Sequence, residues 1–369
     1  MTGNANWFEA CCIVKDDLWI APANYNFFYR LSLKNNKIEE CFFYPGERSY
    51  EVRLFCRIFS SGPKLFLLPA AANEILIFDY ESKIFRSIEI EKKHDANGKQ
   101  VNPNFYQSYD MGTFAILISP TYPDVIYLDY RSETITYSKR IITYLEMNKI
   151  ALHSIYASNY INNKFLLMIK GIKGILCCDY KMENIRIYNY EKEEYQFFNP
   201  CFDGKNVWTI SPKGFGSSFS RHNIEDNRVD HFQIMKTDIE LCESYIGSAY
   251  IDGNIYFFPS RLDSHIIKID INTKNIDYDF GEYEPRVGCS FSLMQELNNE
   301  ILLYEVNENA LWFISKDTKI IRKIFLDNCE NLHLESAKEH DMYRRLPVIR
   351  EQNKYNLQDF LLLLAEVKK

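Results

Sequence analysis

The sequence lacks the features that mark membrane, secreted and nucleic-acid-binding proteins. The nearest candidate for a membrane span, Phe360–Ala365, is far shorter than the roughly 20 apolar residues that a spanning helix needs. The first residues contain neither the basic nor the apolar segment of a signal peptide. The 43 Lys and Arg residues are outnumbered by 50 Asp and Glu residues, which gives a net charge of −7 without any basic block. Because nucleic-acid binding needs a surface that neutralises phosphates, we expect neither a nucleic-acid nor a membrane partner.

Motifs for metal binding and nucleophilic catalysis are also missing. The ten cysteines include the adjacent pairs Cys11-Cys12 and Cys177-Cys178 but no C-x-x-C. Adjacent residues of a strand point to opposite faces, so each pair is expected to be two separate buried thiols, which suits a reducing, cytoplasmic location. The chain has no nucleophile elbow, no H-E-x-x-H and no Walker motif, and its seven histidines do not show metal-binding spacing. We therefore expect no catalytic nucleophile, no metal and no cofactor.

The composition indicates a globular chain that is rich in aromatic residues. Hydrophobic residues make up 46% and charged residues 25% of the 369 residues, while 26 Tyr, 26 Phe and 4 Trp bring the aromatic share to 15%. The first two values are ordinary for folded domains, which excludes disorder for most of the chain.

An internal repeat is the strongest signal in the sequence. A short apolar strand recurs at intervals of 42 to 50 residues. A second strand follows each copy and ends 13 to 15 residues later at a short polar residue. The apolar column is Trp19, Phe66, Ile116, Leu166, Trp208, Tyr256 and Leu302, and the polar column is Ser32, Asp79, Asp129, Asp179, Asn223, Asp270 and Ser315. Because such polar side chains bond to nearby amides where a turn begins, we interpret the second column as structural.

Each repeat contains four strand-like runs that alternate between apolar and polar residues and are separated by turn residues. In the sixth repeat these runs are 248–251, 255–259, 266–271 and 275–280. A period of 40 to 50 residues with four strands in each repeat is typical of a β-propeller. We predict an all-β fold, a seven-bladed β-propeller of four-stranded antiparallel blades over residues 7–327, with the aromatic residues packed between blades.

The pattern resembles the kelch, YVTN and related propeller superfamily over Trp7–Asp327. Fragments such as Phe66–Pro69 and Ile75–Asp79 are similar to uncharacterised bacterial seven-bladed propellers. The chain has neither the Gly-Gly doublet of kelch repeats nor the Trp-Asp dipeptide of WD40 repeats. No functional residue can therefore be carried over from either family.

The two ends of the repeat region predict how the ring closes. The first repeat begins with its own innermost strand near 8–14 and the seventh ends near Leu326, so we expect no strand exchange between the first and last blades. Residues 328–369 are predicted to be a C-terminal extension in which Asn356 caps a terminal helix over 357–367. This helix is expected to pack on the propeller, and the alternative is a partner-binding helix.

Propeller ligands meet the loops that converge near the axis on one face. The loops between second and third strands are recognised by proline at Pro22, Pro69, Pro120, Pro212 and Pro259. On these loops, on the connections into innermost strands and on adjacent strands, the residues selected as candidate ligand contacts are Arg286, His153, Tyr109, Arg221, His222 and Arg261. Such side chains suit peptide or carbohydrate recognition, and they equally suit ordinary solvation.

Two segments depart most from the repeat. In the fifth repeat the loop 212–218 leads into the strand 219–223, which is polar where the other copies are apolar, and this makes it the leading candidate region. The alternative is an irregular blade without a binding loop. The segment Glu91–Asn104 is the longest insertion and is expected to be an exposed excursion, because its Asp-Ala-Asn-Gly stretch lacks the downstream Glu of a calcium loop.

The sequence therefore favours a non-catalytic binding or scaffold propeller that recognises a protein, peptide or carbohydrate. The alternative is a carbohydrate-active enzyme with its site at the central mouth. A glycoside hydrolase would need two carboxylates, for which Asp110, Glu243 and Glu284 are available. A polysaccharide lyase site could use Tyr109 with His153 and Arg286.

Overall fold

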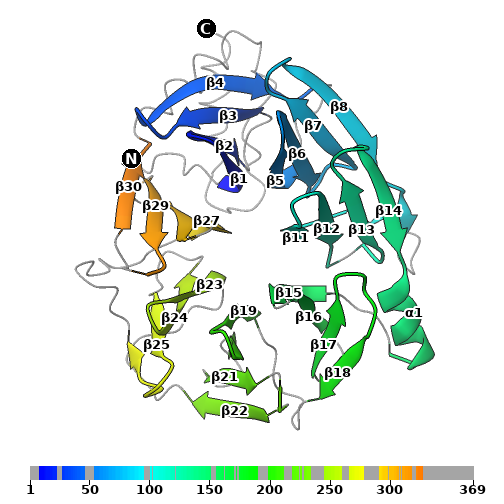
Figure 1. Ribbon diagram of the computed structural model, residues 1–369, viewed down its shortest axis with the longest axis vertical. Helices are drawn as coiled ribbons and strands as arrows, with labels where there is room; N and C mark the ends of the chain where they lie inside the picture. The colour runs from blue at the N-terminus through cyan, green and yellow to red at the C-terminus, as the bar shows by residue number, and fades with distance from the viewer. Residues whose placement is uncertain are drawn as a thin grey trace, which may run out of the picture.

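A computed structural model shows seven four-stranded antiparallel sheets arranged as blades around a central axis (Figure 1). It describes residues 8–22, 27–45, 54–94, 100–101, 103–120, 122–150, 155–161, 163–169, 172, 174–189, 198–211, 218–223, 225–226, 228–233, 245–259, 266–277, 291–297, 299–306, 308, 310–317 and 321–326. The predicted all-β, seven-bladed propeller is confirmed.

Each blade is built from four consecutive strands, the first lying innermost and the fourth outermost (Figure 1). Blade 1 contains β1 (Phe8–Val14), β2 (Asp17–Pro22), β3 (Phe27–Ser32) and β4 (Lys37–Phe43). Blade 2 contains β5 (Phe55–Ser61), β6 (Lys64–Pro69), β7 (Glu74–Asp79) and β8 (Ile84–Glu89). Blade 3 contains β11 (Gln107–Asp110), β12 (Phe114–Ile118), β13 (Val125–Asp129) and β14 (Thr134–Ser138). Blade 4 contains β15 (Ile155–Ile161), β16 (Lys164–Ile169), β17 (Gly174–Asp179) and β18 (Arg186–Asn189).

The remaining blades follow the same order. Blade 5 contains β19 (Phe198–Phe202), β20 (Asn206–Ser211), β21 (Ser218–Asn223) and β22 (Arg228–Gln233). Blade 6 contains β23 (Tyr245–Ile251), β24 (Asn254–Pro259), β25 (Ile267–Asp270) and β26 (Ile276–Asp277). Blade 7 contains β27 (Phe291–Glu296), β28 (Glu300–Glu305), β29 (Ala310–Ser315) and β30 (Ile321–Phe325). The apolar column of the repeat lies in the second strand of every blade, and every third strand ends at the polar residue of the second column.

The turn-starting role of the polar column is confirmed by its hydrogen bonds. The Asp79 carboxylate accepts the backbone N–H groups of Glu81 and Ser82 at 3.1 and 2.9 Å. Asp129, Asp179, Asn223 and Asp270 accept equivalent amides in their own turns. The amide of Ser82 holds the pKa of Asp79 below its usual value because it stabilises the charged form.

Seven apolar cores hold the ring together, one at each seam between neighbouring blades. Because strand residues alternate, Leu18 packs against blade 7 while its neighbour Trp19 packs against blade 2. Trp19 meets Phe78 of blade 2 edge-on, with 6.1 Å between ring centroids. Each fully buried large side chain of this kind contributes about 1.5–3 kcal/mol to the free energy of unfolding.

The adjacent cysteines lie on opposite faces of their strands, as the sequence predicts. Cys11 belongs to the seam between blades 7 and 1, and Cys12 to the seam between blades 1 and 2. Cys177 and Cys178 are divided in the same way between the seams on either side of blade 4. The cysteines within the described ranges are free thiols.

The ring closes by side-chain packing between blades 7 and 1. Both blades are complete sheets of consecutive strands, so the expectation of no strand exchange is confirmed. Their shared core is formed mainly by the central strands β2, β3, β28 and β29, with Ile20 and Leu302 among its buried residues. Nearer the axis, the Cys11 thiol donates to Gln295 Oε1 at 2.8 Å.

One helix lies among the described residues, and no pattern in the sequence predicts it. This helix, α1 (Arg140–Met147), connects blades 3 and 4, and it buries Ile141 and Leu145 in their seam. Its N-cap residue, Lys139, makes no side-chain cap hydrogen bond, so the usual start signal is missing. The predicted helix over 357–367, with the whole extension 328–369, lies outside the described residues.

The insertion between blades 2 and 3 is anchored rather than simply exposed. Residues 93–94 and 100–101 form a small hairpin, β9 (Lys93–His94) and β10 (Gln100–Val101). The Tyr122 hydroxyl donates to the Glu91 carbonyl at 2.8 Å, and the Lys93 ammonium lies 3.4 Å from the buried Asp124 carboxylate. Glu91, Lys92 and His94 are exposed, as expected of an excursion, while these contacts fix the start of the segment to blade 3.

Candidate functional site

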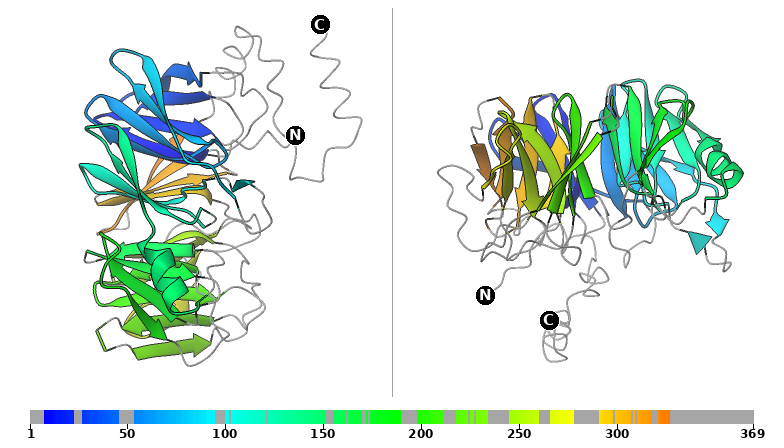
Figure 2. Two further views of the ribbon diagram at one scale, coloured as in Figure 1. Left: turned by 90° about the vertical axis from the view of Figure 1, so that its right-hand side faces the viewer. Right: turned by 90° about the horizontal axis from the view of Figure 1, so that it is seen from below.

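The two faces of the ring differ in the length of their connections. On one face, the turn face, two to three residues join first to second strands and four to six join third to fourth strands. On the opposite face, the loop face, four to seven residues join second to third strands. Connections between blades also start and end there, and they run from 8 residues between β18 and β19 to 17 between β8 and β11. Figure 2 shows the strands crossing the ring between these faces, with β9 and β10 beyond the blades on the loop face.

The turn face is occupied by contacts that link neighbouring blades. Lys83 of blade 2 pairs with Glu40 of blade 1 at 2.9 Å. The Glu133 carboxylate of blade 3 lies 2.5 Å from Lys64 and 2.9 Å from Arg86, both of blade 2. The charged groups on this part of the turn face therefore pair with one another across the seams.

The structure describes three of the six residues proposed as ligand contacts. His153, Arg261 and Arg286 lie outside the described residues, as do the carboxylates Glu243 and Glu284. Tyr109 lies on β11 in blade 3, whereas Arg221 and His222 lie on β21 in blade 5. The structure therefore does not bring the three described residues together in one site.

Tyr109 forms a contact between the innermost strands of blades 3 and 4. Its hydroxyl lies 2.5 Å from Ser158 Oγ, and its ring meets Phe165 edge-on at 5.0 Å. Burial raises the pKa of Tyr109 to about 12, despite the opposing effects of the Ser158 hydrogen bond and the Arg57 charge. Catalytic acids and bases work best when their pKa lies near the working pH, so these surroundings suit a structural hydroxyl better than a catalytic one.

Asp110, the described member of the carboxylate set, lies at the turn-face end of β11. Its Oδ1 accepts the Tyr130 hydroxyl at 3.0 Å and the Gly112 amide at 2.8 Å. Both contacts fix the carboxylate within its own blade.

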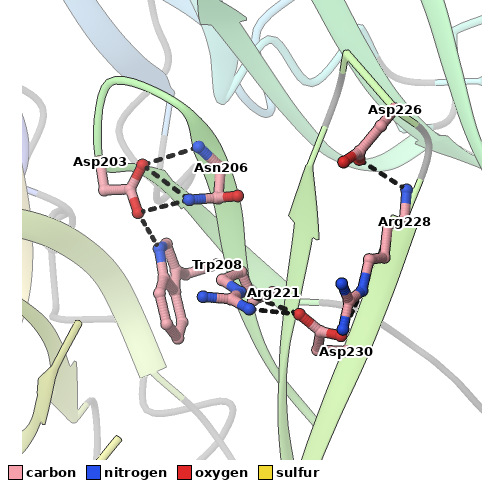
Figure 3. Close-up of polar contacts among 7 residues, drawn as sticks. All are labelled: Asp203, Asn206, Trp208, Arg221, Asp226, Arg228 and Asp230. Atoms are coloured by element: carbon pink, nitrogen blue, oxygen red, sulfur yellow. Dashed lines mark hydrogen bonds and ion pairs between the residues drawn. The ribbon is translucent and has the colours of Figure 1, made fainter. Parts of the chain in front are cut away.

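Blade 5 contains a polar cluster built around a buried tryptophan (Figure 3). Trp208 is fully buried and donates its indole N–H to Asp203 Oδ2 at 2.6 Å. The backbone and side-chain nitrogens of Asn206 donate to the same carboxylate at 2.7 and 3.0 Å. Burial alone would raise the pKa of Asp203, but the bonds from Trp208 and Asn206 outweigh it and lower the pKa.

A second part of this cluster carries an excess of positive charge. Arg221 pairs with Asp230, and Arg228 pairs with the other oxygen of Asp230 at 3.0 Å (Figure 3). The Arg221 guanidinium also lies 5.8 Å from the Trp208 ring centroid, and the Lys274 ammonium lies 4.8 Å from it. The polar character of the strand 219–223 is thus partly explained by ion pairs and cation–π contacts on the side that faces blade 6.

His222 points to the other side of the same strand, toward blade 4. It is 3% exposed, and its ring centroid lies 5.8 Å from that of Tyr188. Next to it, the buried Ser220 hydroxyl bonds to His231 Nδ1 at 2.8 Å. Arg221 and His222 therefore serve two different seams, and the loop 212–217 that precedes them lies outside the described residues.

Sequence reasoning placed Gln107 among the residues that could surround the axis without selecting it as a ligand contact, and it missed Arg57, another polar residue of the innermost strands. Strand pairing places them at equivalent positions of β5 and β11, opposite Leu68 and Ile118. The residues at this level of the seven innermost strands are Ala10, Arg57, Gln107, Ala157, Phe198, Gly247 and Leu293. Arg57 and Gln107 each lie nine residues before the apolar column, at Phe66 and Ile116, so the repeat spacing could have signalled these two polar residues among small and apolar neighbours.

Arg57 and Gln107 both retain unused hydrogen-bonding capacity. Arg57 Nε donates to the Tyr106 carbonyl at 3.0 Å, and Gln107 Nε2 donates to the Ile155 carbonyl at 3.3 Å. The buried Gln107 Oε1 has no hydrogen-bond partner among the described residues. Within the same part of the chain, Arg57 makes no ion pair.

The described residues contain no group of three or more His, Cys, Asp or Glu side chains arranged to hold a metal ion. Nor do they include a helix of the length and hydropathy that crossing a membrane requires.

Comparisons with known proteins identify the fold and no family. No family model and no curated protein sequence matches the chain. Among solved structures, the designed protein Ika8 is 7% identical and superposes with a TM-score of 0.53 over 88% of each chain. Hydrazine synthase from Kuenenia stuttgartiensis is 10% identical, with a TM-score of 0.52 over 85% of this chain and 98% of that one. Virginiamycin B lyase from Staphylococcus aureus is 11% identical, with a TM-score of 0.50 over 88% of this chain and 97% of that one. The superpositions support the propeller architecture without singling out the kelch or YVTN type.

Proposed function

We propose that this chain is a non-catalytic binding propeller whose protein, peptide or carbohydrate ligand docks on the loop face. The asymmetry between the two faces carries this proposal. Short turns require two to six residues, yet the connections between blades on the loop face run to 17 residues. Chain length beyond what a turn requires is typical of binding surfaces, because loops on a rigid scaffold are free to vary in shape.

The contacts of the turn face support the same choice. Its carboxylates are engaged as turn caps, such as Asp79 and Asp270, or as partners of basic residues on the next blade, such as Glu133. Groups committed to holding the blades together are poorly placed to bind a ligand as well. The free thiols of the described cysteines further suit a reducing, cytoplasmic location for this binding protein.

Arrays of glycans and peptides, probed with the labelled full-length protein, test the proposal. Any ligand found is then measured against Arg261→Ala and Arg286→Ala, two changes within segments that join strand ends of the loop face. The matched controls are Arg131→Ala and Lys205→Ala, which are exposed on the turn face. We expect at least one loop-face variant to weaken binding about tenfold, as loss of a charged hydrogen bond does, with both controls unchanged.

Two outcomes would contradict the proposal. If only the turn-face variants weakened ligand binding, the ligand would dock on the turn face instead of the loop face. Turnover of a bound glycan into shorter or unsaturated products would favour the carbohydrate-active enzyme instead.

A further inference from the structure

The innermost strands carry very little positive charge. Across all seven, β1, β5, β11, β15, β19, β23 and β27, the one Lys or Arg is Arg57. Acidic residues in the same strands include Asp110 and Glu296, which lie at the turn-face ends of β11 and β27. Lys316 pairs with Glu296 at 2.9 Å, and Tyr130 binds Asp110. These two carboxylates thus have partners at the far end of the strands from Arg57.

Arg57 lies at the other end, close to the loop face. It is the third residue of β5, which follows the eleven-residue connection 44–54 from blade 1. The side chain is half-buried, and the contact from Nε to the Tyr106 carbonyl fixes the direction of the guanidinium. Both terminal nitrogens remain without a described protein acceptor. A fixed guanidinium whose two terminal nitrogens are free can bind a carboxylate through two parallel hydrogen bonds.

The charge of Arg57 acts on both neighbouring blades. It lowers the pKa of the Cys11 thiol on β1 and of Tyr109 on β11, in each case against a larger rise caused by burial. At Tyr109 the Glu296 carboxylate acts in the opposite direction, but no described carboxylate forms an ion pair with Arg57 itself. A buried or half-buried charge that is left uncompensated is unfavourable unless a ligand supplies the opposite charge.

Gln107 supplies an acceptor at the same level of the neighbouring innermost strand. It directly follows Tyr106, whose carbonyl holds Arg57, and its Oε1 is buried without a hydrogen-bond partner among the described residues. An unpaired buried acceptor costs about 1–3 kcal/mol, an amount that a ligand N–H or O–H can recover. Donor and acceptor together match a ligand that presents a carboxylate beside a hydrogen-bond donor.

The innermost strands favour a peptide as the source of that carboxylate. Each is the first strand of its sheet, so one of its edges has no strand partner and turns toward the axis (Figure 1). Unpaired strand edges offer amides and carbonyls that pair with an extended peptide backbone. A peptide C-terminus carries a carboxylate with an amide N–H two bonds away, which is the pair of groups that Arg57 and Gln107 complement.

We propose that Arg57 is the anchor for a carboxylate of a peptide ligand at the loop-face end of the innermost strands, with Gln107 accepting the adjacent amide N–H. This inference rests on the proposed binding function and specifies the chemistry that the site recognises. Binding is non-covalent and requires no cofactor.

The experiment is a thermal-shift titration of the full chain with N-acetylglycine, which carries a carboxylate and an amide N–H. N-acetylglycinamide is the matched neutral probe, and glucuronate is an acidic sugar. A ligand that binds only the folded state raises the melting temperature with concentration. We expect N-acetylglycine to raise it and the amide to leave it unchanged. We also expect Arg57→Gln to weaken the response about tenfold or more.

Arg131→Gln removes an exposed turn-face cation and is the charge-matched control, with an unchanged response expected. If Arg57→Gln does not fold, Arg57→Lys is tested instead. Lysine keeps the charge but lacks the planar pair of N–H donors, so the response should be intermediate. No response of the wild-type chain to N-acetylglycine, or an equal response in the Arg57 variants, would overturn the proposal. A response to glucuronate alone would overturn the peptide assignment.

The two proposals fail in different ways. Binding of an array ligand that Arg57→Gln does not weaken would remove the anchor and leave the loop-face function intact. The absence of any array ligand would remove the wider function, whereas an Arg57-dependent response to N-acetylglycine would still stand.

Discussion

At the scale of single residues, blade 5 shows how a polar strand is accommodated inside an apolar fold. Arg221 and His222 interrupt the apolar pattern of β21, yet each meets specific partners on its own side of the sheet. The Trp208 indole depends in turn on Asp203, which receives donors from both side chain and backbone. A charged acceptor with several donors is a strong local contact because each bond to a charged group contributes about 1.5–3 kcal/mol.

Replacing Asp203 with Asn should lower the free energy of unfolding by about 1–2 kcal/mol at pH 7, because the acceptor stays but its charge is lost. The pKa of Asp203 is lowered in the folded protein, so the charge stabilises the fold above the unfolded value of about 4. This contribution is lost as the pH falls through the folded pKa. The difference between wild type and variant should therefore shrink as the pH falls below about 4.

Urea denaturation, followed by tryptophan fluorescence at pH 7 and again at a pH below about 4, measures this difference in the free energy of unfolding. Asp226→Asn is the control, since Asp226 is exposed in the same blade and should change stability by less than about 0.5 kcal/mol. A pH-independent difference for the Asp203 variant would show that the lost charge is not its cause.

The residue scale is also where sequence reasoning was least complete. The polar column could be interpreted correctly because an Asp before a turn acts locally, as Asp79 does. The partners of Arg221 and His222 could not be inferred, because they depend on which seam each side of β21 faces. Arg57 was missed although the repeat spacing places it level with Gln107, because the other strands carry mostly small or apolar residues at this position and no shared polar column marks it.

At the scale of elements, the innermost strands combine regular pairing with local irregularity. Six of the seven, all except β11, show a register shift near the end at the loop face. An extra residue at this point bends the strand and redirects the side chains that follow. Neighbouring innermost strands also pack closely, as Gly247 of β23 shows. A Cβ at this position would lie 2.2 Å from Met294 Sδ of β27.

We expect Gly247→Ala to lower the free energy of unfolding by about 0.5–1 kcal/mol, because the added methyl group must displace the end of the flexible, partly exposed Met294 side chain into another rotamer. Met294→Val shortens that side chain, so the double variant Gly247→Ala/Met294→Val should recover part of the loss. Denaturant unfolding of the two single variants and the double variant gives the coupling energy. Strict additivity of the two changes would show that the contact across this seam is not the cause.

Elements were predicted well where a repeated pattern specified them and poorly where a single segment did. The strands of the sixth repeat were found from alternation and turn residues, and the structure shifts only their ends, as in β25. Helix α1 occurs once, has no capping side chain, and gains its stability from burying Ile141 and Leu145 between two blades. That burial is a tertiary effect, and eight residues of sequence do not reveal it.

At the scale of the whole molecule, the ring is a closed series of seven sheets joined through their side chains. Each sheet uses one continuous stretch of chain, and each seam has its own apolar core. The seam between blades 7 and 1 does not differ in kind from the other six, although no peptide segment runs directly between these two blades. The number of blades and their strand order followed from the repeat period, whereas the contacts that close the ring are properties of the assembled structure.

A circular permutant tests this equivalence of the seams. Joining Lys369 to Met1 with a Gly-Ser linker and opening the chain within 190–197, between blades 4 and 5, leaves every sheet continuous. We expect this permutant to fold with a melting temperature close to that of the parent protein. Opening within 212–217 instead divides blade 5 between the two ends of the chain, and should lower the melting temperature clearly.

Circular dichroism and thermal melts of both permutants provide the comparison. Equal destabilisation of the two would show that the natural chain order contributes to stability beyond the integrity of each sheet.

The division of adjacent cysteines between seams provides native chemical reporters of how the ring opens. A buried thiol reacts with an alkylating reagent only after its surroundings open, and burial raises the pKa of Cys11 to about 12. Cys11 and Cys12 are neighbours in the chain but report on two different seams, so one proteolytic fragment records two opening rates. Cys56, Cys178, Cys177 and Cys201 extend this record around the ring, and six of the seven seams thereby carry a native reporter among the described residues. The order in which blades separate can therefore be timed without adding a single label by mutation.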